Sequence, residues 1–130
     1  MKIHSSALVS KKARLERDVE VGPYAVIGAG VKIAKGARIG SFCDVKNDVT
    51  IGAGTQIFTG VAIGNVPQDL KYDGAKSSIV IGENNIIREY CTFNPGTEEG
   101  GRTVIGNNNL FMAYSHVAHD CIIGNDCIIA

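Results

Sequence analysis

Two histidines and an aspartate stand close together near the end of the sequence. His116 and His119 are three residues apart, and Asp120 follows His119 directly. An exposed histidine titrates near neutral pH and can act as a general base, and a neighbouring carboxylate would fix its tautomer and stabilise the protonated ring. The spacing alone fits two surface histidines without a role equally well. A zinc site would need a third ligand, and His4 lies at the other end of the sequence.

The rest of the chain is patterned with a period of six. Neither a helix, with its period of 3.6, nor a single strand, with its period of 2, produces such a repeat. A hexapeptide period predicts a solenoid of short strands, in which the long apolar residue of each strand points inward and successive coils stack in parallel. The apolar positions are Ile3, Val9, Leu15, Val21, Ile27, Ile33, Ile39, Val45, Ile51, Ile57, Ile63, Ile81, Ile87, Phe93, Ile105, Phe111, Val117, Ile123 and Ile129.

The flat sides and the corners between them must position any catalytic side chains. Small residues recur two positions before each inward residue, and glycine often follows it, which suits unusual dihedrals or a close backbone approach. In this frame His116 points outward from a flat side, whereas His119 and Asp120 share a corner. Adjacent side chains diverge on a straight strand but can converge at a corner. The run Asn107 to Asn109 falls at another turn, where asparagine tolerates a left-handed backbone.

Two interruptions break the repeat, near residues 65–78 and 94–103. Both contain proline, glycine and polar residues, which predicts external loops on a single β-helix domain spanning residues 1–130. A loop expelled from a regular solenoid is more often functional than the repeats around it, although a tolerated insertion is the alternative. The sequence stops one residue into a new hexad without a capping element, which suggests the N-terminal part of a longer protein or a coil end covered by another chain.

Composition narrows the class of protein. Thirteen basic and thirteen acidic residues cancel, so charge gives no case for nucleic acid or an anionic membrane surface. No signal peptide or membrane span is recognisable, which predicts a cytoplasmic protein. The four cysteines form no Cys-x-x-Cys pair and are expected to be free thiols that fill the core.

Four segments together carry a family resemblance: Gln68-Asp69-Leu70-Lys71-Tyr72, Ile87-Arg88-Glu89, Gly96-Thr97 and His116-Val117-Ala118-His119-Asp120-Cys121. With them the chain resembles the N-terminal half of bacterial UDP-N-acetylglucosamine O-acyltransferases. The resemblance implies a left-handed parallel β-helix and a homotrimer with active sites between subunits. It implies transfer of an (R)-3-hydroxyacyl group from acyl carrier protein to the sugar 3-hydroxyl, the first step of lipid A biosynthesis. No metal or separate cofactor is implied, because the acyl group arrives on the carrier's phosphopantetheine.

The same resemblance assigns roles to individual residues. His119 corresponds to the general base that takes the proton of the 3-hydroxyl, and Asp120 to its orienting partner. His116 corresponds to a second active-site histidine. The residues that would hold substrate are Gln68, Asp69, Lys71 and Asn94.

The chain departs from the family pattern at two positions, and other functions are compatible with its sequence. Asn94 stands where the family often has a histidine that contacts substrate, and Pro95 stands where arginine is usual. The family's oxyanion donor, acyl-length ruler and C-terminal helices correspond to positions beyond residue 130. The alternative functions are a non-catalytic solenoid that binds the sugar nucleotide or assembles with a partner, and the related N-acyltransferase of the same pathway, against which the Gln68–Tyr72 segment argues.

Overall fold

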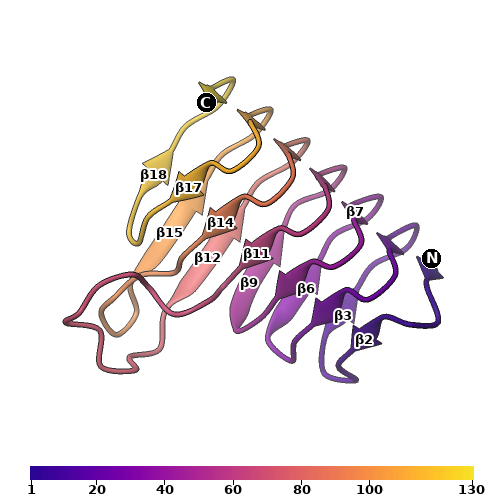
Figure 1. Ribbon diagram of the computed structural model, residues 1–130, viewed down its shortest axis with the longest axis horizontal. Coiled ribbons are helices and arrows are strands. Elements are labelled where there is room, and N and C mark those ends of the chain that lie inside the picture. The colour runs from indigo at the N-terminus through magenta and orange to yellow at the C-terminus, as the bar shows by residue number, and fades with distance from the viewer.

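The chain winds as a parallel β-helix with three flat sides (Figure 1). The computed structural model describes residues 1–130 and contains nineteen short strands, which enter three sheets in strict rotation. The solenoid predicted from the hexapeptide period is therefore confirmed. The first sheet contains β1 (Lys2–Ile3), β4 (Glu20–Val21), β7 (Arg38–Ile39), β10 (Gln56–Ile57), β13 (Ile86–Ile87), β16 (Leu110–Phe111) and β19 (Ile128–Ile129). The second contains β2 (Leu8–Val9), β5 (Val26–Ile27), β8 (Asp44–Val45), β11 (Ala62–Ile63), β14 (Thr92–Phe93) and β17 (His116–Val117). The third contains β3 (Arg14–Leu15), β6 (Val31–Ile33), β9 (Asp48–Ile51), β12 (Ser78–Ile81), β15 (Arg102–Ile105) and β18 (Ile122–Ile123).

Strand register shows where the coil is lengthened. In the regular part, Lys2 pairs with Glu20, eighteen residues further on. Ala62 pairs with Thr92, thirty residues on, because the segment 64–77 lies in that coil. Thr92 pairs in turn with His116, twenty-four residues on, because the segment 94–101 lies in the next coil. Both segments leave the solenoid without disturbing the parallel pairing on either side of them.

The core is a stack of aliphatic columns. The last residue of every strand is one of the nineteen hexapeptide positions, as the period predicts. In the middle coils these side chains are almost completely buried, whereas Ile3 in the first coil is 44% exposed. Phe93 and Phe111 lie on adjacent coils and pack edge to face, with ring centroids 5.0 Å apart. The buried apolar side chains therefore form one core cluster that continues from coil to coil.

A buried polar ladder runs through the core beside these columns. The side-chain amide of Asn85 donates to the carbonyl of Gly106, and its oxygen accepts from the backbone N–H of Asn109. Asn109 repeats the pattern with Gly124 and Cys127. Of the asparagines expected to serve the turn, only Asn108 has a positive φ, of 60°. Asn109 is instead 2% exposed and links two coils, a role that turn propensity did not predict.

Glycines at one corner allow successive coils to approach closely. A Cβ atom added to Gly52 would lie 2.2 Å from the carbonyl oxygen of Gly82, and one added to Gly82 would lie 2.5 Å from that of Gly106. None of these three glycines has a positive φ. Close approach, rather than unusual dihedrals, is therefore why glycine follows the inward residue at this corner.

Two of the four cysteines fill the core as predicted, whereas Cys121 and Cys127 are only partly buried. All four cysteines are free, with Cys43 and Cys91 buried in the core. Burial raises the pKa of the Cys43 thiol, as expected for a residue that fills space rather than reacts. The structure contains no helix long and apolar enough to cross a membrane.

Candidate active site

The two segments outside the solenoid lie side by side at one corner (Figure 1). Both connect a strand of the second sheet to a strand of the third, from β11 to β12 and from β14 to β15. The backbone N–H of Gly100 donates to the carbonyl of Lys76, and the N–H of Lys76 donates to the Glu99 carboxylate, both at 2.9 Å. The turn between β17 and β18, which carries His119 and Asp120, occupies the same corner one coil further on. This corner therefore gathers side chains from three coils.

His119 and Asp120 face each other across the turn. Nδ1 of His119 lies 2.9 Å from Oδ2 of Asp120. The two side chains converge because Asp120 has a left-handed backbone, with φ at 64°, a conformation that aspartate tolerates better than most residues. An ionised carboxylate can only accept, so Nδ1 carries the hydrogen of this bond. In neutral His119 this arrangement leaves a lone pair on Nε2.

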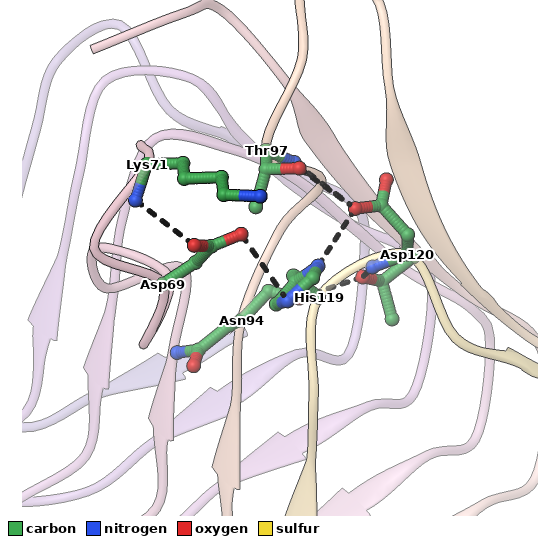
Figure 2. A network of polar contacts seen from close by, with 7 residues as sticks. Asp69, Lys71, Asn94, Thr97, His119 and Asp120 are labelled. Atoms are coloured by element: carbon green, nitrogen blue, oxygen red, sulfur yellow. Dashed lines mark hydrogen bonds and ion pairs between the residues drawn. The ribbon is translucent and has the colours of Figure 1, made fainter. Parts of the chain in front are cut away.

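Asp69 faces the opposite edge of the imidazole. Its Oδ2 lies 3.7 Å from Nε2 of His119, which is longer than a hydrogen bond, and its Oδ1 accepts from the backbone N–H of Lys71 at 2.9 Å. The side chains of His119 and Asp69 are 34% and 26% exposed. Two carboxylates therefore flank a partly open histidine, one on each ring nitrogen (Figure 2).

Thr97 holds the Asp120 carboxylate from the neighbouring coil. Its backbone N–H and its hydroxyl donate to Oδ2 of Asp120 at 3.2 and 3.1 Å. The pKa of Asp120 is below its ordinary value, chiefly because His119 donates a hydrogen bond to the carboxylate. Desolvation opposes this shift, and the two donors of Thr97 reinforce it. Asp120 is therefore ionised at any pH near neutrality.

Thr103 fixes the backbone beneath the pair. Its hydroxyl is fully buried, accepts from the backbone N–H of Asp120 at 3.0 Å and donates to the carbonyl of Asn94 at 2.7 Å. The side chain of Asn94 is only 3% exposed, and its Oδ1 has no hydrogen-bond partner. No sequence motif indicates a role for Thr103. What sets it apart in the sequence is a hydroxyl at an inward position of the hexad, where the preceding coils carry Val31, Val49 and Ile79.

The remaining residues singled out from the sequence lie around this network. Lys71 extends over Asp69 toward Thr97 (Figure 2), and all three line one open pocket. Gln68 is exposed on the same loop. His116 points outward from β17, as predicted, but its Nδ1 lies 2.8 Å from the Thr92 hydroxyl rather than near a carboxylate.

The arrangement can abstract a proton. In neutral His119 only Nε2 is available as a base, because Nδ1 carries the hydrogen that it donates to Asp120. The proton would come from a group that approaches Nε2 beside Asp69, and the imidazolium that forms would lie between two carboxylates. This is the geometry of a general base with an orienting acid, at an edge that a polar substrate can reach.

The repeats and the three-sided coil define a hexapeptide-repeat β-helix. Residues 102–130 match the family model for the bacterial transferase hexapeptide (six repeats). His119 and Asp120 lie within these residues, at a corner between two flat sides of the β-helix.

Within this class, the chain matches the N-terminal half of UDP-N-acetylglucosamine acyltransferases, as the motifs predicted. It is 55% identical over 129 residues to an acyl-[acyl-carrier-protein]–UDP-N-acetylglucosamine O-acyltransferase of Sulfurovum sp., covering 98% of this chain and 50% of the relative. A crystal structure of a UDP-N-acetylglucosamine acyltransferase superposes with a TM-score of 0.96 at 48% identity, over 100% of this chain and 51% of that one. The Campylobacter jejuni enzyme gives a TM-score of 0.92 at 41% identity, over 98% and 50%. The chain spans about half the length of the curated relatives that it matches.

Proposed function

We propose that the protein transfers an (R)-3-hydroxyacyl group from acyl carrier protein to the 3-hydroxyl of UDP-N-acetylglucosamine, the first step of lipid A biosynthesis. The observation that supports this most directly is the His119–Asp120 contact at 2.9 Å, with Nε2 left free at an open corner. The relatives named above are named as acyltransferases of UDP-N-acetylglucosamine, and the name of the Sulfurovum relative adds acyl carrier protein and O-acyl transfer. The reaction would draw on acyl carrier protein in the cytoplasm, the location expected from the sequence.

In the proposed reaction His119 acts first as base and then as acid. Nε2 takes the proton of the sugar 3-hydroxyl as that oxygen attacks the thioester carbonyl. The tetrahedral intermediate then collapses, the carbon–sulfur bond breaks, and the imidazolium returns the proton to the departing phosphopantetheine thiolate. Asp120 keeps the ring oriented throughout and stabilises its charged form. His119 is therefore neutral again at the end of each reaction cycle.

The loop residues can contact a polar substrate in two ways. Asp69 lies beside Nε2, where its carboxylate can accept from a sugar hydroxyl next to the one that reacts. The pocket that Asp69 shares with Lys71 is also lined by Asp73, Glu98 and Glu99, so Lys71 is its one cation for a nucleotide phosphate. Gln68, Asn94 and His116 stay predicted contacts of the substrate. The homotrimer, with its clefts between subunits, is part of the same proposal.

Acyl transfer by a complete active site tests the proposal. Residues 1–130 would be fused to the part of the Sulfurovum relative that the match does not cover, and transfer from (R)-3-hydroxyacyl carrier proteins to UDP-N-acetylglucosamine would be measured. His119→Ala should reduce kcat by about 10²–10⁴-fold, the usual contribution of a general base. His4→Ala is the matched control, because His4 is exposed in the first coil and its side chain hydrogen-bonds only to Ser6.

Two results would contradict the proposal in different ways. A folded fusion that binds the nucleotide but transfers no acyl group would refute the activity. Equal transfer by the parent and His119→Ala would refute the role of His119 while leaving the activity in place.

A further inference from the structure

One oxygen of Asp120 receives three hydrogen bonds. Oδ2 accepts from Nδ1 of His119 at 2.9 Å, and from the hydroxyl and backbone N–H of Thr97 at 3.1 and 3.2 Å. The side chain of Asp120 is 43% exposed, so solvent alone would let the carboxylate rotate. The orientation of Oδ2 toward His119 therefore depends on the donors that Thr97 supplies from the preceding coil.

The loop that carries Thr97 also approaches the other oxygen. A Cβ atom added to Gly96 would lie 2.6 Å from Oδ1 of Asp120, and one added to Gly101 would lie 3.1 Å from it. The two glycines thus let the backbone of residues 96–101 come close to one side of the carboxylate. Glycine therefore stands where the backbone must come close to Asp120, and threonine stands where hydrogen-bond donors to its carboxylate are needed.

We propose that Thr97 is a positioning residue, which orients Asp120 so that neutral His119 keeps its hydrogen on Nδ1 and its lone pair on Nε2. The consequence for catalysis rests on the proposed function, but the effect on the tautomer does not. Thr97 acts through Asp120 and needs no contact with the reacting atoms. The tautomer of a histidine is set by the hydrogen bond that its other nitrogen makes.

His116 provides a comparison within the same chain. Its Nδ1 also lies 2.8 Å from an oxygen, but that oxygen belongs to the hydroxyl of Thr92. A hydroxyl can donate or accept, so it does not select a tautomer, whereas an ionised carboxylate can only accept. His119 is therefore the histidine of this chain whose tautomer is fixed by a charged partner, and only its tautomer should respond to Thr97.

The experiment reads the tautomers directly by NMR. The 130-residue chain would be labelled with ¹⁵N-histidine, and long-range ¹H–¹⁵N spectra would be recorded at a pH where the rings are neutral. Thr97→Val removes the hydroxyl donor and keeps the shape, and Thr97→Ser keeps the donor. Thr97→Ala, which removes the hydroxyl without a branched side chain, replaces Thr97→Val if that variant does not fold.

The wild type and Thr97→Ser should hold His119 with its hydrogen on Nδ1. In Thr97→Val the ratio of the Nδ1–H form to the Nε2–H form should fall by about tenfold, as expected for the loss of one hydrogen bond to an ionised group. His4 and His116 should not change. An unchanged ratio at His119, or a change in Thr97→Ser as large as in Thr97→Val, would overturn the proposal.

Kinetics of the fused enzyme separate this role from substrate contact. Thr97→Val should lower kcat with little change in the KM for UDP-N-acetylglucosamine, because the substrate site is kept while the base is misoriented. A raised KM with an unchanged tautomer ratio would show that Thr97 contacts substrate instead. Because the NMR measurement requires no turnover, failure of the proposed activity would leave the tautomer result intact.

Discussion

Thr103→Val should destabilise the protein by removing a single buried oxygen. The hydroxyl of Thr103 accepts from the backbone N–H of Asp120 and donates to the carbonyl of Asn94, so its loss unpairs two backbone groups. Each buried group left unpaired costs about 1–3 kcal/mol, and the N–H of Asp120 lies nearer to solvent, so we expect a total of about 2–4 kcal/mol. The column itself accepts valine, because the equivalent inward positions are Val31, Val49 and Ile79.

The midpoint of urea unfolding measures this loss, provided that the slope of the transition is unchanged. Thr50→Val is the matched control, since Thr50 is an outward residue of the same sheet next to Val80. It should change stability by no more than about 0.5 kcal/mol. If Thr103→Val is no more destabilising than Thr50→Val, the claim that Thr103 fixes the backbone of the active-site corner is wrong.

Three further predictions concern the coil and the acid. Gly52→Ala should lower the urea midpoint by the equivalent of about 1–3 kcal/mol, because its Cβ would meet the carbonyl of Gly82. Gly124→Ala is the control and should be tolerated, because the space around Gly124 is open. Equal effects of the two substitutions would contradict the close approach of the coils at Gly52. Asn109→Ala should cost about 1–3 kcal/mol in the same assay, since it unpairs two partly buried backbone groups, the carbonyl of Gly124 and the N–H of Cys127. A loss below about 0.5 kcal/mol would show that water replaces the ladder. Because the folded pKa of Asp120 lies below its ordinary value of about 3.9, its carboxylate contributes stability above that pH, and the contribution is lost as the pH falls through the lower folded pKa. Asp120→Asn should therefore reduce the difference between the urea midpoints at about pH 5.5 and about pH 2.5, and an unchanged difference would argue against the lowered pKa.

The period of six predicted the fold because each flat side needs one long apolar residue pointing inward. That requirement is local and repetitive, so Ile51, Ile81 and Ile105 mark the ends of their strands even though two external segments separate them. The lengths of those coils could not be predicted from the period. They depend on loop segments whose conformation is set by contacts such as the one between Lys76 and Glu99.

The candidate site was predictable in part. The type and spacing of His119 and Asp120 indicated a base and its acid, but their contact depends on the left-handed backbone of Asp120, which spacing does not determine. The approach of Asp69 to Nε2 depends on how a loop two coils away folds back. Thr97 and Thr103 act through hydrogen bonds between coils, and such pairings follow from the register of the sheets rather than from any local motif.

The pH dependence of acyl transfer tests the central claim most directly. In the fused enzyme, kcat/KM for UDP-N-acetylglucosamine would be measured across the pH range in which NMR shows His119 to lose its proton. If Nε2 of His119 is the base, kcat/KM should fall tenfold for each pH unit below that transition, because only the neutral ring can accept the proton of the hydroxyl. A rate that stays constant through the protonation of His119 would contradict the account.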